Sequence, residues 1–259
     1  MIELRNISFS YGDRPILKNV SFCIEDDESA VIMGPSGSGK STILRLILGL
    51  NCPQKGELNV NEGNICRMRE RDKQEVRKRI GMVFQDGALF DSLTVGENVG
   101  YYLFEHTDLP QPEIERRVRE MLGFVGLNAT EIIDVLPEFL SGGMQRRVAI
   151  ARALLSTNPQ IMLYDEPTTG LDPESTENVL RLINRLTKER SISTIVVTHQ
   201  IADALSMADR FIVIYDGEVA FDGSGEELRK CTDPRVMNFL EPFLNGVDVV
   251  RKRKFVNNV

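Results

Sequence analysis

The fold is decided by residues 34–41, which read Gly34-Pro35-Ser36-Gly37-Ser38-Gly39-Lys40-Ser41. This segment fits the pattern G-x-x-x-x-G-K-[ST] completely. The apolar run at 29–33 predicts a buried strand before it, and a helix is expected from Gly39 to about Leu48. In a strand–loop–helix setting, glycines let backbone N–H groups surround phosphates, and the positive end of the helix points at them. The sequence therefore predicts a phosphate site formed by residues 34–42, that is, the loop and Thr42.

Two side chains of this segment have expected tasks. Lys40 would reach the β- and γ-phosphates of a nucleotide, and the Ser41 hydroxyl would ligate Mg²⁺. A second apolar strand, 161–165, ends in the paired carboxylates Asp165 and Glu166. The first carboxylate is placed to hold Mg²⁺ through water, and the second to polarise an attacking water. We therefore expect a nucleotide and a magnesium ion at one site.

Composition sets the frame around this site. The chain has 259 residues, 42% apolar and 27% charged, which suits one large soluble domain or a core with a subdomain. A net charge of −7 argues against a nucleic-acid partner. No apolar run approaches a membrane span and the N-terminus lacks a signal-peptide core, so other chains would do any spanning. Disulfides and a zinc site are not expected, and a reducing cytoplasm fits best, because four cysteines are scattered without metal-type spacing: Cys23, Cys52, Cys66 and Cys231.

Strand and helix patterns alternate along the chain. Apolar–polar alternation predicts antiparallel strands at 2–9 and 16–24, and a hairpin is expected at 211–221 around Asp216-Gly217. From Val95 to Ser156 the pattern is helical. The remaining apolar runs predict buried strands at 80–84, 161–165 and 193–198. Strands alternating with helices indicate an α/β fold with a mainly parallel central sheet, interrupted by a helical insert.

A third segment, Leu140-Ser141-Gly142-Gly143-Met144-Gln145, lies between the two nucleotide-site motifs. The order of the three resembles the ATP-binding cassette (ABC) ATPases over nearly the whole chain. The resemblance implies a P-loop core with a mainly parallel sheet, an N-terminal antiparallel β subdomain and a helical subdomain inserted at about 86–159. It places the ATPase domain at 1–231 and a C-terminal extension at 232–259. It also implies ATP and Mg²⁺ as cofactors and ATP hydrolysis as the activity.

The same resemblance assigns roles to single residues. Gln85 would be the Q-loop glutamine, which touches Mg²⁺ or its water, and His199 the switch histidine on the γ-phosphate. Asp172 would belong to the D-loop after the Walker B strand. Tyr11 would stack on adenine, with a tyrosine packed at a turn as the alternative.

The Ser141-Gly142-Gly143 segment predicts a second phosphate site. Ser141 is an N-cap residue by type, the glycines allow close backbone approach to an anion, and a helix is expected from here to about Leu155. Because this site has no lysine, it suits the γ-phosphate of a nucleotide bound elsewhere. In the ABC family that nucleotide is held by a second copy in a head-to-tail dimer. Met144 stands where the family most often has glutamine.

Four stretches resemble a narrower branch, the ATPases of lipid-transporting MCE systems of the Mla type: 81–95, 105–110, 140–144 and 233–240. That resemblance implies a peripheral protein on the cytoplasmic face of the inner membrane. There it would energise phospholipid transport with an MlaE-like permease, MCE-domain proteins and, in some members, a STAS-domain subunit. An importer of amino acids or metal ions is the first alternative. A soluble ABC protein acting on ribosomes or DNA is the second, and it would usually carry two cassettes or a long coiled coil.

The tail beyond Cys231 allows three interpretations. A short helix candidate is followed by an apolar group, 247–250, and a basic group, 251–254. The tail could be a solvated end, an arm that packs on a neighbouring subunit as in the Mla branch, or a contact for anionic lipid headgroups. The arm is the favoured interpretation.

Overall fold

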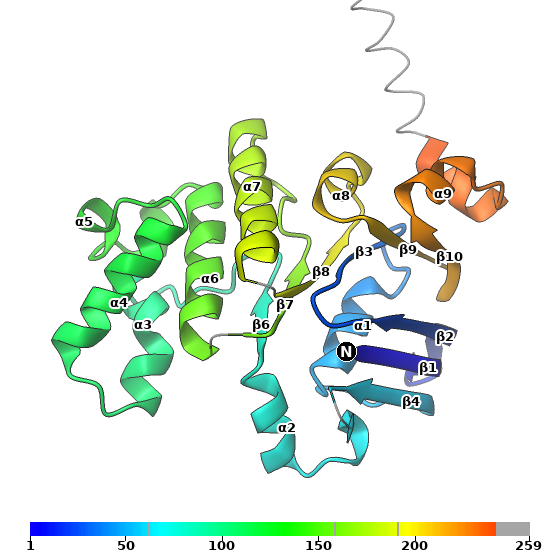
Figure 1. Ribbon diagram of the computed structural model, residues 1–259, viewed down its shortest axis with the longest axis horizontal. Helices are drawn as coiled ribbons and strands as arrows, with labels where there is room; N and C mark the ends of the chain where they lie inside the picture. The colour runs from blue at the N-terminus through cyan, green and yellow to red at the C-terminus, as the bar shows by residue number, and fades with distance from the viewer. Residues whose placement is uncertain (62, 158, 191, 242–259) are drawn as a thin grey trace, which may run out of the picture.

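The computed structural model describes residues 1–61, 63–157, 159–190 and 192–241, and its centre is a six-stranded sheet (Figure 1). The strand order is β10-β9-β3-β8-β7-β6, and all neighbours are parallel except the β9–β10 pair. The predicted hairpin is confirmed, since Asp216 and Gly217 turn the chain with positive φ. The strands are β3 (Ser29–Met33), β6 (Ile80–Val83), β7 (Ile161–Asp165), β8 (Ser193–Thr198), β9 (Arg210–Tyr215) and β10 (Glu218–Ser224).

A second, antiparallel sheet forms from the N-terminal strands in the order β2-β1-β4-β5. The predicted pair is present as β1 (Ile2–Tyr11) and β2 (Arg14–Ile24), joined by β4 (Lys55–Val60) and the short β5 (Gly63–Asn64). The backbone N–H of Lys18 donates to Gly217 O at 2.7 Å, which fastens this sheet to the β9–β10 turn. The sequence did not predict β4 because it is short and mixes charged residues with glycine.

Helices cover both faces of the central sheet. Successive residues of β3 enter different core clusters: Val31 packs in the cluster with α7 (Pro173–Arg190) and α8 (Ile201–Met207). Ile32 packs in the cluster with α1 (Lys40–Ile47) and the N-terminal sheet. This alternation follows from the two-residue period of a strand. The helix α2 (Glu70–Arg77) was not predicted, because it has no buried residue and so no apolar period.

The predicted helical stretch forms a separate group beside the edge strand β6 (Figure 1, green). It contains α3 (Val95–His106), α4 (Gln111–Phe124), α5 (Ala129–Ile132) and α6 (Gly142–Thr157). Thr94 begins α3 with a capping box in which Glu97 is the reciprocal partner. Short 3₁₀ turns lie at η1 (Ile65–Arg67) and η2 (Pro137–Phe139), and α9 (Gly225–Lys230) follows β10.

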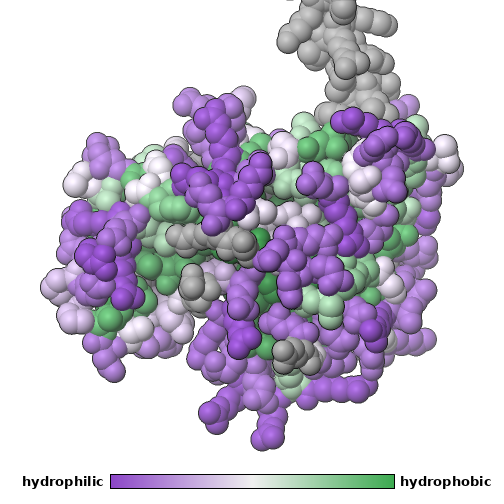
Figure 2. Space-filling model, viewed as in Figure 1, coloured by the Kyte–Doolittle hydropathy of each residue, from purple (hydrophilic) through white to green (hydrophobic). Residues whose placement is uncertain are grey.

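The start of the C-terminal extension is helical at 234–241, and it docks by burying Val236 and Leu240 in the core. The groups at 247–250 and 251–254, on which the arm and headgroup interpretations depend, lie outside the described residues. Within the described ranges no helix is long and apolar enough to cross a membrane. Figure 2 shows hydrophilic side chains over most of one face.

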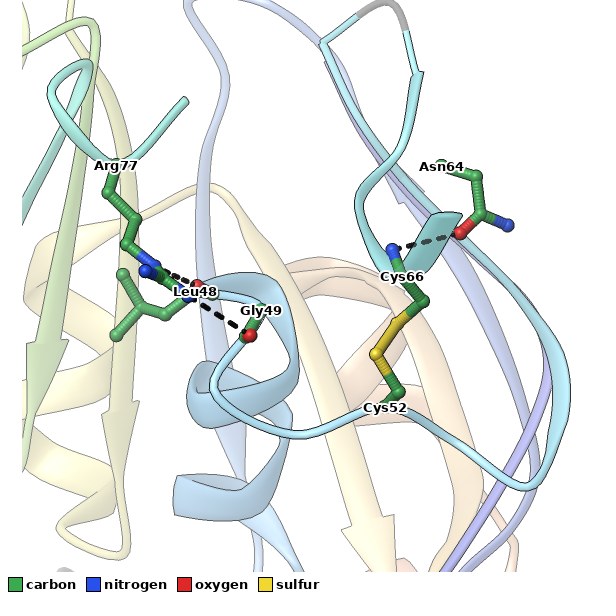
Figure 3. The surroundings of a disulfide bond; sticks show 6 residues. All are labelled: Leu48, Gly49, Cys52, Asn64, Cys66 and Arg77. Atoms are coloured by element: carbon green, nitrogen blue, oxygen red, sulfur yellow. Dashed lines mark hydrogen bonds between the residues drawn. A yellow bond between two sulfur atoms is a disulfide. The ribbon is translucent and has the colours of Figure 1, made fainter. Parts of the chain in front are cut away.

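The expectation that no disulfide forms is wrong. Cys52 and Cys66 are bonded across 14 residues, with their Cα atoms 5.6 Å apart, while Cys23 and Cys231 are free (Figure 3). The loop after α1 and the turn η1 meet at this point. Arg77 holds the loop by donating to Leu48 O at 2.9 Å and Gly49 O at 3.2 Å (Figure 3). Spacing along the chain could not reveal the pair because β4 and β5 bring the two residues together.

Opening this disulfide is expected to lower the free energy of unfolding by about 3 kcal/mol, because a bond that closes a loop of this length restricts the unfolded chain. Urea unfolding without reductant should show the difference between the unsubstituted chain and Cys52→Ala/Cys66→Ala. Cys23 is a free thiol, so Cys23→Ala is the control. The difference in free energy of unfolding between this variant and the unsubstituted chain should be the same with and without reductant. Identical stabilities with and without reductant would contradict the prediction.

Candidate nucleotide-binding site

Three neighbouring strands bring part of the predicted site together. In the order β3-β8-β7, the P-loop follows β3, His199 follows β8, and Asp165 and Glu166 end β7. Carboxyl ends of parallel strands meet at one edge of a sheet, where open α/β folds bind ligands. The sequence predicted each segment separately, and the strand order makes them one site.

The P-loop needs glycine at positions 34 and 39. A Cβ on Gly34 would lie 2.0 Å from the carbonyl oxygen of Ile214. Gly39 has φ 106, and a Cβ there would meet the Leu17 side chain at 2.6 Å. The loop is therefore pressed against the β9–β10 hairpin and β2, with no room for a side chain at either place.

Lys40 is buried at the start of α1, with 6% of its surface exposed. Its Nζ donates to Gly34 O at 2.8 Å and Pro35 O at 3.0 Å. Burial lowers the pKa of Lys40, and the nearby carboxylates of Glu166 and Asp165 oppose that shift. Two of its three ammonium protons thus hold the loop in shape, and one remains for a ligand.

Two of the three predicted metal ligands, Ser41 and Asp165, are adjacent. Ser41 Oγ donates to Asp165 Oδ1 at 2.9 Å. Burial is the largest cause of the raised pKa of Asp165, and the Ser41 hydrogen bond works against it. A half-buried carboxylate beside a hydroxyl is an oxygen pair of the kind that Mg²⁺ accepts, since this ion needs few protein ligands. The residues therefore fit the metal. The third predicted ligand, Gln85, is exposed in the turn after β6.

Glu166 has more partners than any other predicted residue of the site. It is buried, and its φ of 50 is unusual for a side chain of this size. His199 Nδ1 lies 2.8 Å from Glu166 Oε1. The other carboxylate oxygen, Oε2, accepts from Thr169 Oγ1 at 3.0 Å and Thr198 Oγ1 at 3.2 Å. The carboxylate is thereby oriented from three sides, which a general base requires.

The hydroxyls around Glu166 were not predicted from the sequence. Thr169 and Thr198 lie inside or beside predicted motifs, and Gln200 Nε2 donates to Thr169 Oγ1 at 3.3 Å. The one sign in the sequence was that both are hydroxyl residues in or beside the motifs that carry Glu166 and His199. The pairing of β7 with β8 brings Thr198 to the same carboxylate oxygen of Glu166 that Thr169 contacts.

Tyr11 ends β1 with 42% of its surface exposed. Its ring meets the Phe9 ring edge-on, with centroids 4.8 Å apart, and its hydroxyl accepts from Arg45 Nη1 at 3.4 Å. Arg45 lies on α1, the helix that the P-loop begins. An exposed ring anchored beside this helix suits stacking on a base. The adenine role of Tyr11 stays a prediction.

Residues 141–143 lie apart from the P-loop. Ser141 is exposed and caps α6 by accepting from Met144 N at 3.3 Å. Cβ atoms built on the two glycines would approach Leu171 at 3.2 Å and Ser175 at 2.4 Å. Asp172 caps α7 at the same place, since its Oδ1 accepts from Ser175 N at 3.0 Å. Among the described residues no hydrogen bond joins 141–143 to residues 34–42.

Two arginines of α6, also unforeseen, grip the turn that carries Gln85. Arg146 is 5% exposed and donates to Phe84 O. Arg152 donates to Gly87 O at 3.0 Å and Ala88 O at 2.8 Å. Burial lowers the pKa of both guanidinium groups. The helix that begins at Gly142 is therefore tied directly to the turn around Gln85.

The chain belongs to the ABC transporter family, because the family model described as "ABC transporter" matches residues 17–169. It is 42% identical to the intermembrane phospholipid transport system ATP-binding protein MlaF of Haemophilus influenzae, over 95% of this chain and 92% of that protein. It is 40% identical to the methionine import ATP-binding protein MetN of Clostridioides difficile, over 88% of this chain and 70% of that protein.

Among solved structures, the fold resembles a dimeric, post-hydrolysis state of the ATP-binding cassette MJ0796 bound to ADP and Pi. The TM-score is 0.79 at 37% identity, with 86% of this chain and 98% of that chain covered. The predicted fold class and family are confirmed, and the chain is an ATP-binding, ATP-hydrolysing cassette. The roles of single residues remain predictions.

Proposed function

We propose that this chain is the ATP-hydrolysing subunit of a transporter that moves phospholipid between membranes. The observation that carries the proposal is its 42% identity to a phospholipid-transport ATPase over nearly the full length of both chains. The amino-acid importer remains the alternative, supported by 40% identity to MetN with only 70% of that protein covered.

At the site, backbone N–H groups of residues 34–42 and the Lys40 ammonium would bind the β- and γ-phosphates. Mg²⁺ would be held by Ser41 and Asp165 with Gln85 as a further ligand, and it would neutralise phosphate charge. Glu166 would take the proton of the attacking water, since its carboxylate is already oriented by Thr169, Thr198 and His199. His199 would also contact the γ-phosphate, because 43% of its side chain is exposed at the strand ends.

A second copy of the chain would complete each site. Ser141, Gly142, Gly143 and Asp172 lie together, and Ser141, Gly142 and Asp172 are exposed. They would close over the nucleotide held by the other copy in a head-to-tail dimer. The dimeric cassette with ADP and Pi supports this arrangement.

The partners we propose are an MlaE-like permease, MCE-domain proteins and, where present, a STAS-domain subunit, with no nucleic acid. The chain would sit on the cytoplasmic face of the inner membrane as a peripheral subunit. We also propose 1–231 as the ATPase domain, with the helical subdomain at about 86–159, and 232–259 as an extension.

Purification of the tagged complex from membranes tests the transported substrate. We expect a polytopic permease and an MCE-domain protein to copurify, together with bound phospholipid identified by mass spectrometry. A complex that contains an amino-acid permease and a periplasmic amino-acid-binding protein would replace this proposal with the importer.

Tyr11→Ala is expected to raise the KM for ATP by about tenfold and leave kcat nearly unchanged, because stacking on a base contributes about 1–3 kcal/mol. Steady-state kinetics at varied ATP would measure both constants. Tyr11→Phe keeps the ring and loses only the contact with Arg45, so its KM should stay close to that of the unsubstituted chain. Equal KM values for the alanine and phenylalanine variants would contradict the stacking role.

A further inference from the structure

A short, partly buried hydrogen bond lies in the turn that follows Glu166. Thr168 Oγ1 donates to Asp203 Oδ2 at 2.6 Å, across 35 residues of sequence. Thr168 is 1% exposed, and Asp203 is half-buried in the first turn of α8. The bond therefore joins the turn after β7 to the helix after β8.

At one end, Thr168 controls the backbone that carries Glu166. The positive φ of Glu166 is a conformation that non-glycine residues rarely adopt, so the surrounding contacts must maintain it. Glu166 N donates to Val197 O at 2.8 Å on one side, and Thr169 N donates back to Glu166 O at 3.3 Å on the other. Thr168 lies inside that turn. Its anchored side chain fixes the turn and with it the Thr169 hydroxyl that donates to Glu166.

At the other end, Asp203 fixes the segment that carries His199. The helix α8 begins directly after His199 and Gln200, and Ala204 N donates to Gln200 O at 3.0 Å in its first turn. Asp203 faces Thr168 from this turn. Movement of α8 away from the turn after β7 would therefore separate His199 Nδ1 from Glu166 Oε1, which are now 2.8 Å apart.

We infer that Asp203 is a positioning residue for ATP hydrolysis, which acts through Thr168 to hold Glu166 and His199 in contact. Asp203 itself reaches neither the P-loop carbonyls bonded by Lys40 nor the Ser41–Asp165 pair. Its loss should therefore slow the chemical step more than it weakens nucleotide binding. This inference rests on the proposed role of Glu166 as the general base.

The test compares kcat and the KM for ATP in the full chain, isolated from membranes with the subunits that accompany it. Thr168→Val keeps the shape and removes the donor, while Thr168→Ser restores it. We expect Thr168→Val to lower kcat about tenfold or more with little change in KM, because small misplacements of catalytic groups are costly. Thr168→Ser should recover most of kcat. The double variant Thr168→Val/Asp203→Leu should lose no more than the worse single variant, since the two residues act as one unit.

A matched control separates positioning from stability. Thr194 is equally buried on β8, and its hydroxyl lies 2.9 Å from Thr187 Oγ1, at the end of the strand away from His199. Thr194→Val should lower the melting temperature and leave kcat unchanged. If Thr168→Val does not fold, Asp203→Asn and Asp203→Leu replace it, and the leucine variant should lose kcat while the asparagine variant keeps most of it.

Three outcomes are decisive. Loss of kcat in Thr168→Val with rescue by Thr168→Ser supports the inference. If Thr168→Val and Asp203→Leu keep normal kcat while Glu166→Gln is inactive, the positioning role of Asp203 is overturned and the proposed function stands. If Glu166→Gln is itself fully active, the proposed role of Glu166 has failed and this inference fails with it.

Discussion

Glu166→Gln is expected to lower the rate of ATP hydrolysis by about 10²–10⁴-fold and to leave ATP binding intact, because the amide keeps the shape but cannot accept the proton of water. Glutamine can still accept hydrogen bonds from Thr169 and Thr198 through its one carbonyl oxygen. The P-loop contacts of Lys40 are untouched. Phosphate release at saturating ATP would measure the loss, and binding of a fluorescent ATP analogue would show that the site remains.

The same variant should accumulate an ATP-bound dimer, since closure is no longer followed by hydrolysis. Native mass spectrometry with and without ATP would detect it. Glu226→Gln is the control, because Glu226 is exposed on α9 and pairs with Lys230 in the same helix. If the intact complex holds only one copy of the ATP-loaded variant, the proposal that residues 141–143 serve a second copy is refuted.

Lys40→Ala is expected to remove about 2–4 kcal/mol of phosphate binding or transition-state stabilisation, because a buried ammonium is lost from an enclosed site. ATP hydrolysis should then fall to background. The carbonyls of Gly34 and Pro35 lose their donor, but the change is confined to one loop, so circular dichroism should show a folded protein. Near-normal hydrolysis by this variant would refute the assigned phosphate site.

Mixing two inactive variants tests whether the sites are shared. Ser141→Arg blocks the segment that would face the partner's nucleotide, and Lys40→Ala blocks phosphate binding in its own chain. A mixed dimer keeps one intact composite site and collects both defects in the other. The mixed dimer is expected to be well above either variant alone in ATP hydrolysis. If isolated mixed dimers form but hydrolyse no ATP, that result would count against sharing of the sites.

The parts of this protein that could be read from sequence are those in which neighbouring residues decide the geometry. The glycines of the loop 34–41 are set by the geometry of that loop itself. The run 161–166 predicts both a buried strand and the carboxylates at its end. The strands β1, β2, β3, β7 and β8 appeared within a few residues of their expected limits, because each carries a plain apolar pattern. In contrast, β4 and α2 were missed, since β4 is short and mixes charged residues with glycine, and α2 has no buried residue.

The sequence by itself determined the fold class, the family and the chemical types gathered at the nucleotide site, since all three depend on short contiguous segments with strong local preferences. Only the tertiary structure decided that Cys52 bonds to Cys66, that Thr198 donates to the carboxylate of Glu166, and that Arg146 and Arg152 hold the turn around Gln85. These contacts join segments separated in the chain. Their geometry is set by strand order and helix packing, which no single segment contains.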